Sequence, residues 1–522
     1  MGDAMTSGTV SLADSRPPLV LALDLGSSSV RCGVYDSGAR AVKGMASRLP
    51  HRLGNQRDGS STADPDALLA ALFQCVDSVM ERLGSAASEI VAAGTCTFVT
   101  NVMGTDAAGR PVMPLTTYGD TTSWGQAERL AVELDPEAVH QRVGCYFHPS
   151  YLPSRFRRWQ ETDPARFGRV TRWITLGEYL ERVLFGPSVN IGLTHSVASW
   201  TGLLNRHTLD WDEELLEHLG VDIRTLPGLI DIAPTHRVLL PQFAARWPAL
   251  EKVQWFPAIG DGAAANIGSA KSSAAGTVVV TLGTTGAMRV ITDGPLPHIP
   301  DGLWCYRVDR KRLLPGGALS EGGNIHAWMR ETLNLAETSR LEKIVAAMDA
   351  DAHGLTVLPF FAGERSPGWR GRASATLHGI TLATTPQDII RAGMESVALR
   401  LGMIFDRLRP LLPQTDPTVS RQPPIVAGGR ALVASPAWAQ ILADVLGYDV
   451  EVCALEETSS RGVALLMLST LQALSRDGYV DVPGTLYHPD PQAHAVYQAA
   501  RERQIRLYDF ICRNDDNPKD NQ

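Results

Sequence analysis

An aspartate between two glycines, Asp261, is the residue of this chain best suited to act as a general base. It follows the apolar segment 255–260 (WFPAIG) and precedes a run of small residues, 263–265. This pattern predicts a strand that ends in a tight connection to a helix, with the carboxylate at its tip. A carboxylate placed there can accept a proton from a hydroxyl group, and it can also cap the helix.

Two turns rich in glycine and hydroxyl residues could bind phosphate. Each offers backbone N–H groups and hydroxyl donors without a bulky side chain. Asp24 lies just before the first turn and could hold Mg²⁺ through water, because Mg²⁺ keeps several waters and needs few carboxylates. An aspartate at a strand end is also a common turn residue, and the second turn has Thr281 at that place. The candidate phosphate contacts are Gly26, Ser27, Ser28 and Ser29 in the first turn, and Gly283, Thr284 and Thr285 in the second.

The two turns belong to a repeated pattern. Each is flanked by two apolar stretches, at 18–36 and 277–292, which predict a β-hairpin. At an offset of 257 residues (280 − 23), Leu23–Ser28 lies over Val280–Thr285, with Leu-Gly and two hydroxyl residues at the same places. A single turn of this kind is common, but two at the heads of successive halves predict two related lobes.

A third glycine-rich loop and the two chain ends complete the pattern. An apolar strand runs into Gly428 and Gly429 before a helix at 436–446, so a ligand can approach this backbone closely. Residues 1–17 and 513–522 lack apolar periodicity, and we expect them to be disordered or frayed.

Composition excludes several classes of protein. The 522 residues carry 48 basic and 56 acidic side chains, a net charge of −8, so no basic field for nucleic acid exists. The seven cysteines are scattered without a CxxC pair, which favours reduced thiols and a cytoplasmic location. The longest nearly apolar run, 462–474, is too short to cross a membrane. The Walker A, HExxH, Rossmann GxGxxG and GxSxG motifs are all absent from the sequence.

Taken in order, these motifs resemble the FGGY family of carbohydrate kinases in the actin-like ATPase superfamily. The resemblance covers 18–475. Leu23–Arg31 (LDLGSSSVR) and Leu282–Gly286 (LGTTG) resemble the two phosphate motifs, and Gly260–Ser269 resembles the segment with the catalytic aspartate. Ala427–Leu446 resembles the adenosine motif, and Ala375–Glu395 resembles the C-terminal signature with a departure at Gly393.

The resemblance implies an α/β fold of the actin-like, ribonuclease H-like type. Two lobes, each a mixed sheet flanked by helices, are expected to enclose ATP and a sugar in a central cleft. Residues 18–270 would form the sugar-binding lobe with the catalytic aspartate, and 271–475 would form the nucleotide-binding lobe. A disordered leader at 1–17 and a helical tail with a frayed end at 476–522 would flank them.

The resemblance also implies roles for single residues. Asp261 becomes the general base, Asp24 becomes the carboxylate on the Mg²⁺ side, and Gly262 lies at the sugar. The residues of the two turns become contacts to the phosphates of ATP, with Mg²⁺ as the second cofactor. Four glycines complete the nucleotide site: Gly428 and Gly429 lie under adenine and ribose, and Gly322 and Gly323 lie near the nucleotide.

The substrate contacts depart from the family pattern. Many members carry Trp-x-Asp-x-Arg, whereas this chain has Tyr118, Asp120 and Thr122 at those places. Arg155 stands where a lysine is frequent, in a cluster that would equally suit an exposed helix face. The segment 144–151 (GCYFHPSY) is most similar to gluconate-kinase branches, so we expect a sugar acid, D-gluconate first, with Arg155 binding its carboxylate.

Two other functions stay open. One is a kinase for a ketopentose or another polyol of the xylulose or ribulose type. The other is a non-catalytic sugar-sensing protein of the same fold, which is disfavoured because such a protein would be expected to lose Asp24 or Asp261. The expected partners are ATP and a sugar or sugar acid, without nucleic acid or membrane, and a homodimer is compatible with the sequence.

Overall fold

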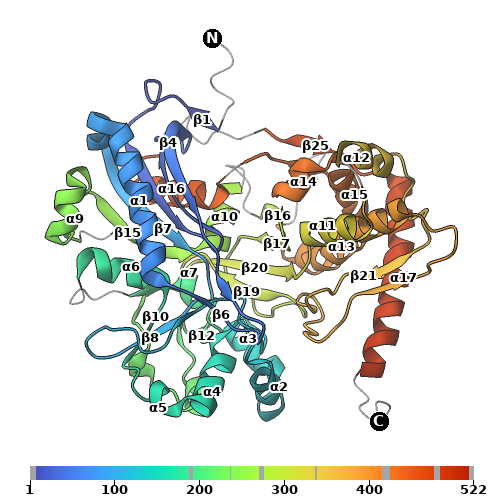
Figure 1. Cartoon of the computed structure of the whole chain (residues 1–522), viewed down its shortest axis with the longest axis horizontal. Helices are drawn as coiled ribbons and strands as arrows, with labels where there is room; N and C mark the ends of the chain where they lie inside the picture. Colours follow the sequence, from blue (N-terminus) through green and yellow to red (C-terminus); the bar gives the residue numbers. More distant parts are fainter. Residues whose placement is uncertain are drawn as a thin grey trace.

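The computed structural model describes residues 8–186, 192–234, 237–269, 276–335, 338–413, 424–455, 457–474 and 483–515. Its elements form two lobes, one built mainly from the first half of the chain and one from the second (Figure 1). None of the described helices combines the length and the apolar character needed to span a bilayer. The six cysteines that the structure describes are buried, as expected for packing residues.

The first lobe contains a six-stranded mixed sheet. Its centre is parallel, and its central strands are buried on both faces, as their Val-, Leu- and Ala-rich sequences require. The strand order is β1 (Thr9–Val10), β4 (Ala41–Pro50), β3 (Ser29–Tyr35), β2 (Leu19–Leu25), β7 (Ile90–Thr97) and β15 (Gln254–Gly260).

The second lobe contains an eight-stranded mixed sheet built on the same plan. Its hairpin of two antiparallel strands also continues into a parallel neighbour, β16 beside β23. The order is β18 (Thr292–Asp293), β20 (Arg312–Leu319), β17 (Gly286–Val290), β16 (Val278–Leu282), β23 (Ile425–Gly428), β24 (Val450–Val452) and β25 (Thr485–Tyr487), with β19 (Trp304–Arg307) also paired to β20. The structure therefore confirms the two predicted hairpins.

Helices cover the faces of both sheets (Figure 1). On the first lobe, α1 (Pro65–Leu83) begins at an Asp64 N-cap that accepts from two backbone N–H groups, with a proline at the first turn. The other helices of this half are α2 (Trp124–Glu133), α3 (Pro136–Val143), α4 (Leu152–Thr162), α5 (Pro164–Phe167), α6 (Leu176–Phe185), α7 (His195–Ala198), α8 (Glu213–Leu219), α9 (Pro241–Arg246) and α10 (Asp261–Ser269). The second half supplies α11 (Gly323–Thr332), α12 (Thr338–Ala346), α13 (Pro386–Leu408), α14 (Arg430–Ala434), α15 (Pro436–Leu446), α16 (Thr458–Thr470) and α17 (Pro491–Asp515).

Short strands pair outside the two large sheets. They are β5 (Gly54–Asn55), β6 (Ser61–Ala63), β8 (Met103–Thr105), β9 (Leu115–Thr116), β10 (Arg172–Ile174), β11 (Leu193–Thr194), β12 (Leu204–Asn205), β13 (Asp210–Trp211), β14 (Leu229–Ile230), β21 (Thr356–Leu358) and β22 (Thr376–His378). Most of them pair loops of the first half of the chain, and β21 and β22 pair with each other in the second half.

One helix from the second half of the chain belongs to the core of the first lobe. In Figure 1, α16 lies beside α10 and β7. It also contacts β2, and its apolar residues form one core with those of α10, β2 and β7. The two helices touch backbone to backbone: a methyl group on Gly462 would lie 1.8 Å from the Ala264 carbonyl oxygen. The same holds at Gly268, where a methyl group would lie 1.9 Å from the Thr458 carbonyl oxygen.

The ends of the chain correct one expectation. The prediction of a disordered leader is wrong for residues 8–17, because Thr9–Val10 pair with β4 and Val10 is buried in the first core. Residues 1–7 lie outside the described residues. The helical tail is present as α17, which packs along α15, and residues 516–522 of the expected frayed end also lie outside the described residues.

The α10–α16 contact should tolerate no side chain at residue 462. We expect Gly462→Ala to lower the free energy of unfolding by about 3 kcal/mol, because the added methyl group must displace the backbone of α10. Urea denaturation followed by tryptophan fluorescence measures it. Gly228→Ala is the matched control, since a methyl group there meets open space. Equal stability of the two variants would contradict the contact.

Candidate active site

Two carboxylates stand at the carboxyl ends of parallel strands in the first sheet. Asp24 pairs with Cys96 in the β2–β7 ladder, and Asp261 follows the last residue of β15 on the other side of β7. Asp24 is almost fully buried, and its Oδ2 accepts from Arg31 Nη1 at 2.8 Å. Carboxyl ends of parallel strands are where ligands bind in open α/β sheets.

Burial changes the protonation of both groups. Desolvation raises the pKa of Asp24, although the charge of Arg31 opposes it. Desolvation also raises the pKa of Asp261 to about 6, and the charge of Asp24 adds to this, whereas the charge of Arg289 lowers it. A carboxylate whose pKa lies near neutral pH is ionised at pH 7 and is still basic enough to take a proton.

The first phosphate turn is closed by its own backbone. Gly26 N donates to the Ser29 carbonyl at 3.1 Å, and this leaves Ser28 exposed and Ser27 half-buried at the tip. Ser29 lies below the tip, buried, and its Oγ accepts from Arg48 Nε at 3.1 Å. The geometry therefore favours Ser27 and Ser28 as ligand contacts and gives Ser29 the role of holding the turn.

The second turn is packed against the two other predicted glycine pairs. Thr284 and Thr285 are exposed at its tip, and Gly323 N donates to the Gly283 carbonyl at 2.7 Å. A methyl group on Gly322 would lie 2.7 Å from the Thr285 carbonyl carbon, and one on Gly429 would lie 2.5 Å from the Leu282 carbonyl oxygen. Gly428 pairs with Thr281 in the sheet. The fold thus brings all three segments, distant in sequence, into one cradle of backbone without side chains.

The segment with Tyr118 and Asp120 forms a tight turn in the first lobe. Tyr118 is 46% exposed and free to meet a ligand. Asp120 is buried, and its oxygens accept from Ser61 N and from the N–H and hydroxyl of Thr122. Thr122, at the place of the family arginine, therefore satisfies Asp120 and does not extend toward a sugar.

The structure corrects the expectation for Arg155. Its guanidinium is buried and donates to three backbone carbonyls: Nε to Pro149 at 2.9 Å, Nη1 to Thr100 at 2.6 Å and Nη2 to Thr117 at 2.5 Å. Burial lowers the pKa of Arg155 to about 10, which the charge of Asp120 opposes. A guanidinium committed to carbonyls is poorly placed to bind a carboxylate, so Arg155 positions the segment that carries Tyr118. The exposed helix face considered from the sequence is also wrong for this residue.

Gly262 lies against residues that sequence reasoning did not select. A methyl group there would lie 2.9 Å from Trp200 Cη2 and 3.5 Å from Arg289 Nε. Trp200 stacks on Tyr306 of β19 with ring centroids 3.7 Å apart, and the Tyr306 hydroxyl lies 2.5 Å from that of Tyr151. Arg289 is the one cation in the otherwise apolar strand β17, and this isolated charge was the signal available in the sequence.

A cluster of three titratable side chains lies in the second half of the chain, outside this site. Asp351, His353 and Glu395 are close enough to share a cation, but His353 Nε2 lies 2.9 Å from Glu395 and Arg503 pairs with Asp351. Each of these groups thus already has a protein partner.

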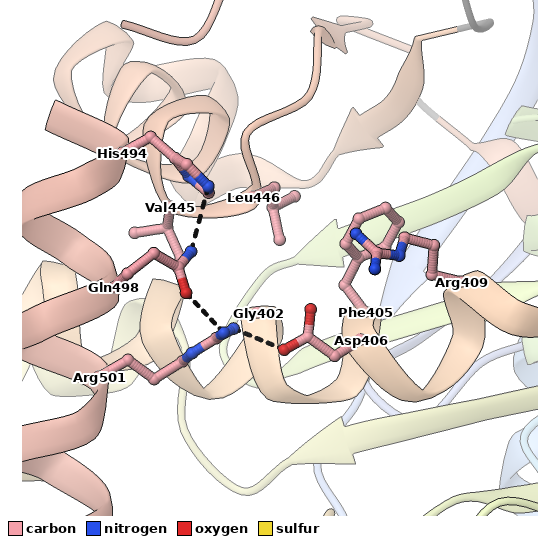
Figure 2. Close-up of a pocket in the computed structure, with 9 residues that line it drawn as sticks. All are labelled: Gly402, Phe405, Asp406, Arg409, Val445, Leu446, His494, Gln498 and Arg501. Carbon is pink, nitrogen blue, oxygen red and sulfur yellow. Dashed lines mark hydrogen bonds and ion pairs between the residues drawn. The ribbon is translucent and has the colours of Figure 1, made fainter. Parts of the chain in front are cut away.

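A cavity of about 320 Å³ lies between α13, α15 and α17 in the second lobe (Figure 2). Its polar side chains bond to one another, with Gln498 between His494 and Arg501 and with Arg501 2.7 Å from Asp406. These mutual contacts favour a structural role for this part of the lobe.

The fold and the site together are those of a two-lobed, actin-like phosphotransferase. Two family models match the chain: the N-terminal domain of the FGGY family of carbohydrate kinases over residues 19–268, and the C-terminal domain of that family over 278–471. The chain belongs to the FGGY family of carbohydrate kinases, enzymes that transfer a phosphoryl group to a sugar hydroxyl, with ATP as the donor that the family implies.

Known relatives span nearly the whole chain. A gluconokinase from Bacillus subtilis (strain 168) is 25% identical over 504 residues, 94% of each chain, and a glycerol kinase from Pseudomonas aeruginosa is 26% identical over 511 residues, 94% of this chain and 96% of its own. The crystal structure of gluconate kinase from Lactobacillus acidophilus matches with a TM-score of 0.84 at 21% identity, covering 94% of this chain and 98% of its own. A xylulose kinase from the same organism gives 0.84 at 20% identity, covering 95% and 98%. These structures confirm the predicted fold.

The raised pKa of Asp261 has a consequence for stability. The folded protein keeps this proton up to about pH 6, whereas the unfolded chain releases it near the usual 3.8, so the ionised group destabilises the fold increasingly as pH rises from 4 to 6. We expect Asp261→Asn to stabilise the ligand-free protein at pH 8 by up to about 3 kcal/mol, and to make no difference below pH 4.

Urea denaturation of the ligand-free protein between pH 4 and pH 8 measures this difference. Asp210→Asn, at an exposed aspartate, is the control and should leave stability unchanged. A loss of stability in Asp261→Asn at pH 8 would show that the carboxylate is favourably paired in the folded protein.

Proposed function

We propose that this carbohydrate kinase transfers the γ-phosphoryl group of ATP to a hydroxyl of a sugar acid, with D-gluconate as the favoured substrate. One observation carries the proposal: Asp261 follows the end of β15, its half-buried carboxylate has a raised pKa, and the charges of Asp24 and Arg289 both act on it. The carboxylate of Asp24 could bind the metal ion that accompanies a phosphate, and the cation of Arg289 could attract an anionic acceptor. The gluconokinases and the gluconate kinase among the relatives support the same reading.

In the proposed reaction, Asp261 accepts the proton of the attacking hydroxyl. Ser27 and Ser28 of the first turn, and Thr284 and Thr285 of the second, bind the phosphates, and the glycine cradle at 322–323 and 428–429 accepts the nucleoside. Closure of the lobes would exclude water, which otherwise competes as acceptor. In this proposal 18–270 acts as the sugar lobe and 271–475 as the nucleotide lobe, except that α16 (Thr458–Thr470) packs in the core of the first lobe, and 476–522 is the tail. A cytoplasmic location and a homodimer stay predictions.

The site also fits Mg²⁺. Desolvation raises the pKa of both carboxylates, and the charge of Asp24 adds to the rise at Asp261, so a divalent cation would offset the cost of ionising them. Asp24 has one oxygen bound to Arg31, which suits contact through water, as Mg²⁺ prefers. When bound, Mg²⁺ would neutralise charge on the phosphates. Asp24 would hold it, and Arg31 fixes the orientation of that carboxylate.

Asp261→Asn should lower kcat by roughly 10²–10⁴-fold, because the amide cannot take the proton, and should leave ATP binding unchanged. Steady-state kinetics and calorimetric titration with ATP measure the two effects. Asp210→Asn serves as the control. A kcat near that of the wild type would remove Asp261 from the role of base.

A substrate panel separates the candidate functions. With ATP consumption as readout, we expect kcat/KM for D-gluconate to exceed those for D-xylulose, D-ribulose and glycerol by at least about tenfold, because the acid alone can pair with a cation in the site. If kcat/KM is higher for a ketopentose or a polyol than for D-gluconate, that compound replaces the sugar acid as the proposed substrate. ATP binding without turnover of any sugar would favour the sensing protein.

A further inference from the structure

Two guanidinium groups from the second lobe are close enough for their charges to interact, and the first lies beside Gly262, the residue after Asp261. The first is Arg289 of β17, whose Nε is buried without a hydrogen-bond partner and would lie 3.5 Å from a methyl group on Gly262. Its aliphatic stem packs over Gly316 of β20, where a methyl group would lie 3.0 Å from the Arg289 Cγ. The side chain is therefore held in place by its stem, and its charged end has no protein partner at Nε.

The second guanidinium, that of Arg365, lies 5.8 Å over the ring of Trp304, and its Nε is also buried without a partner. Its two neighbours in the chain are tied down. Glu364 accepts from Arg400, from the Tyr508 hydroxyl at 2.6 Å and from Gly368 N at 3.1 Å. Ser366 exchanges hydrogen bonds with Ala318 of β20 through its N–H and its Oγ. Anchoring on both sides preorganises Arg365 before any ligand arrives.

The two cations lack a carboxylate partner and repel each other. Among the described residues, neither lies within 4 Å of an Asp or Glu oxygen. Burial lowers the pKa of Arg289 and the charge of Arg365 lowers it further, whereas Asp261 opposes both. Like charges held together in a partly desolvated place raise the free energy of the protein unless an anion offsets them. Arg155 differs, because three carbonyls already occupy its guanidinium.

The charges follow one another in a fixed order. The charge of Asp24 acts on Asp261, the charges of Asp261 and Arg289 act on each other, and that of Arg365 acts on Arg289. Two negative charges, at Asp24 and Asp261, and two positive charges, at Arg289 and Arg365, thus act within one site. A substrate that matches these charges has a hydroxyl at one end and an anionic group at the other.

We propose that Arg289 and Arg365 form the carboxylate-binding end of the substrate site, with Arg365 as the principal contact. This inference rests on the proposed function and names the residues that would select an acid. A guanidinium fork matches the two oxygens of a carboxylate. Trp200, which lies against Gly262, stacks on Tyr306, and Tyr306 stacks on Trp304, over which Arg365 lies. A buried aromatic stack thus links the surroundings of Asp261 to Arg365.

The test compares D-gluconate with D-glucitol, which has a neutral hydroxymethyl group in place of the carboxylate. At saturating ATP, we expect Arg365→Gln to raise KM for gluconate by about 10–100-fold. Its kcat/KM for glucitol and its KM for ATP should stay as in the wild type. Arg365→Lys should recover part of the loss, because it keeps the charge without the fork. Arg289→Lys, which keeps the charge beside Asp261, should show a smaller rise in KM.

Arg110→Gln, at a side chain that is 79% exposed, is the matched control and should change nothing. Thermal denaturation verifies that each variant is folded. If the wild type prefers gluconate and Arg365→Gln leaves its KM unchanged, the carboxylate-binding role is overturned while the proposed function stands. If the wild type prefers glucitol or another neutral polyol, the sugar-acid substrate and the carboxylate-binding role both fall.

Discussion

The site depends on one constraint: Asp24 and Asp261 must stand at the carboxyl ends of two parallel strands on either side of β7, where both carboxylates are desolvated enough for their pKa values to rise. The β2–β7–β15 register sets their separation, since Asp24 and Ile259 both lie beside Cys96. The contact of α10 with α16 holds the helix that Asp261 begins, and it is close enough that only glycine fits at 268 and 462. Desolvation raises the pKa of both carboxylates, and the charge of Asp24 adds to this at Asp261, whose pKa lies at about 6.

The second lobe supplies what the first lacks. Its hairpin turn, Gly322–Gly323 and Gly428–Gly429 form a cradle of bare backbone, and its strand β17 brings Arg289 to Asp261. An apolar cluster shared by both lobes, with Trp200 and Ala263 from one and Ala287 and Tyr306 from the other, lies beneath these groups. The surroundings of Asp261 are therefore built by both lobes, and the repeat in the sequence reflects two similar sheets that face one site.

The sequence predicted those parts of the site that depend on local geometry. A strand, a Leu-Gly step and two hydroxyl residues define a hairpin tip wherever they occur, so Ser27, Ser28, Thr284 and Thr285 were found without knowledge of the fold. Asp261 was found in the same way, between a strand and a run of small residues. The sequence also predicted ligand contacts at Ser29 and Arg155, whose side chains bond to the protein instead. Arg48 donates to Ser29, and Arg155 donates to three backbone carbonyls, and no local pattern shows either contact.

By itself, then, the sequence determined two related hairpins with glycine and hydroxyl residues at their turns, and a strand that ends at Asp261, because periodicity and turn chemistry act over a few residues. Only the tertiary structure decided which guanidinium groups are satisfied by the protein itself. The guanidinium of Arg155 donates hydrogen bonds to the carbonyls of residues 100, 117 and 149. In Arg289 and Arg365, by contrast, the Nε atom is buried and has no hydrogen-bond partner. The physical reason is that a guanidinium is available to a ligand only if nothing distant in sequence satisfies it first, and long-range packing alone settles that.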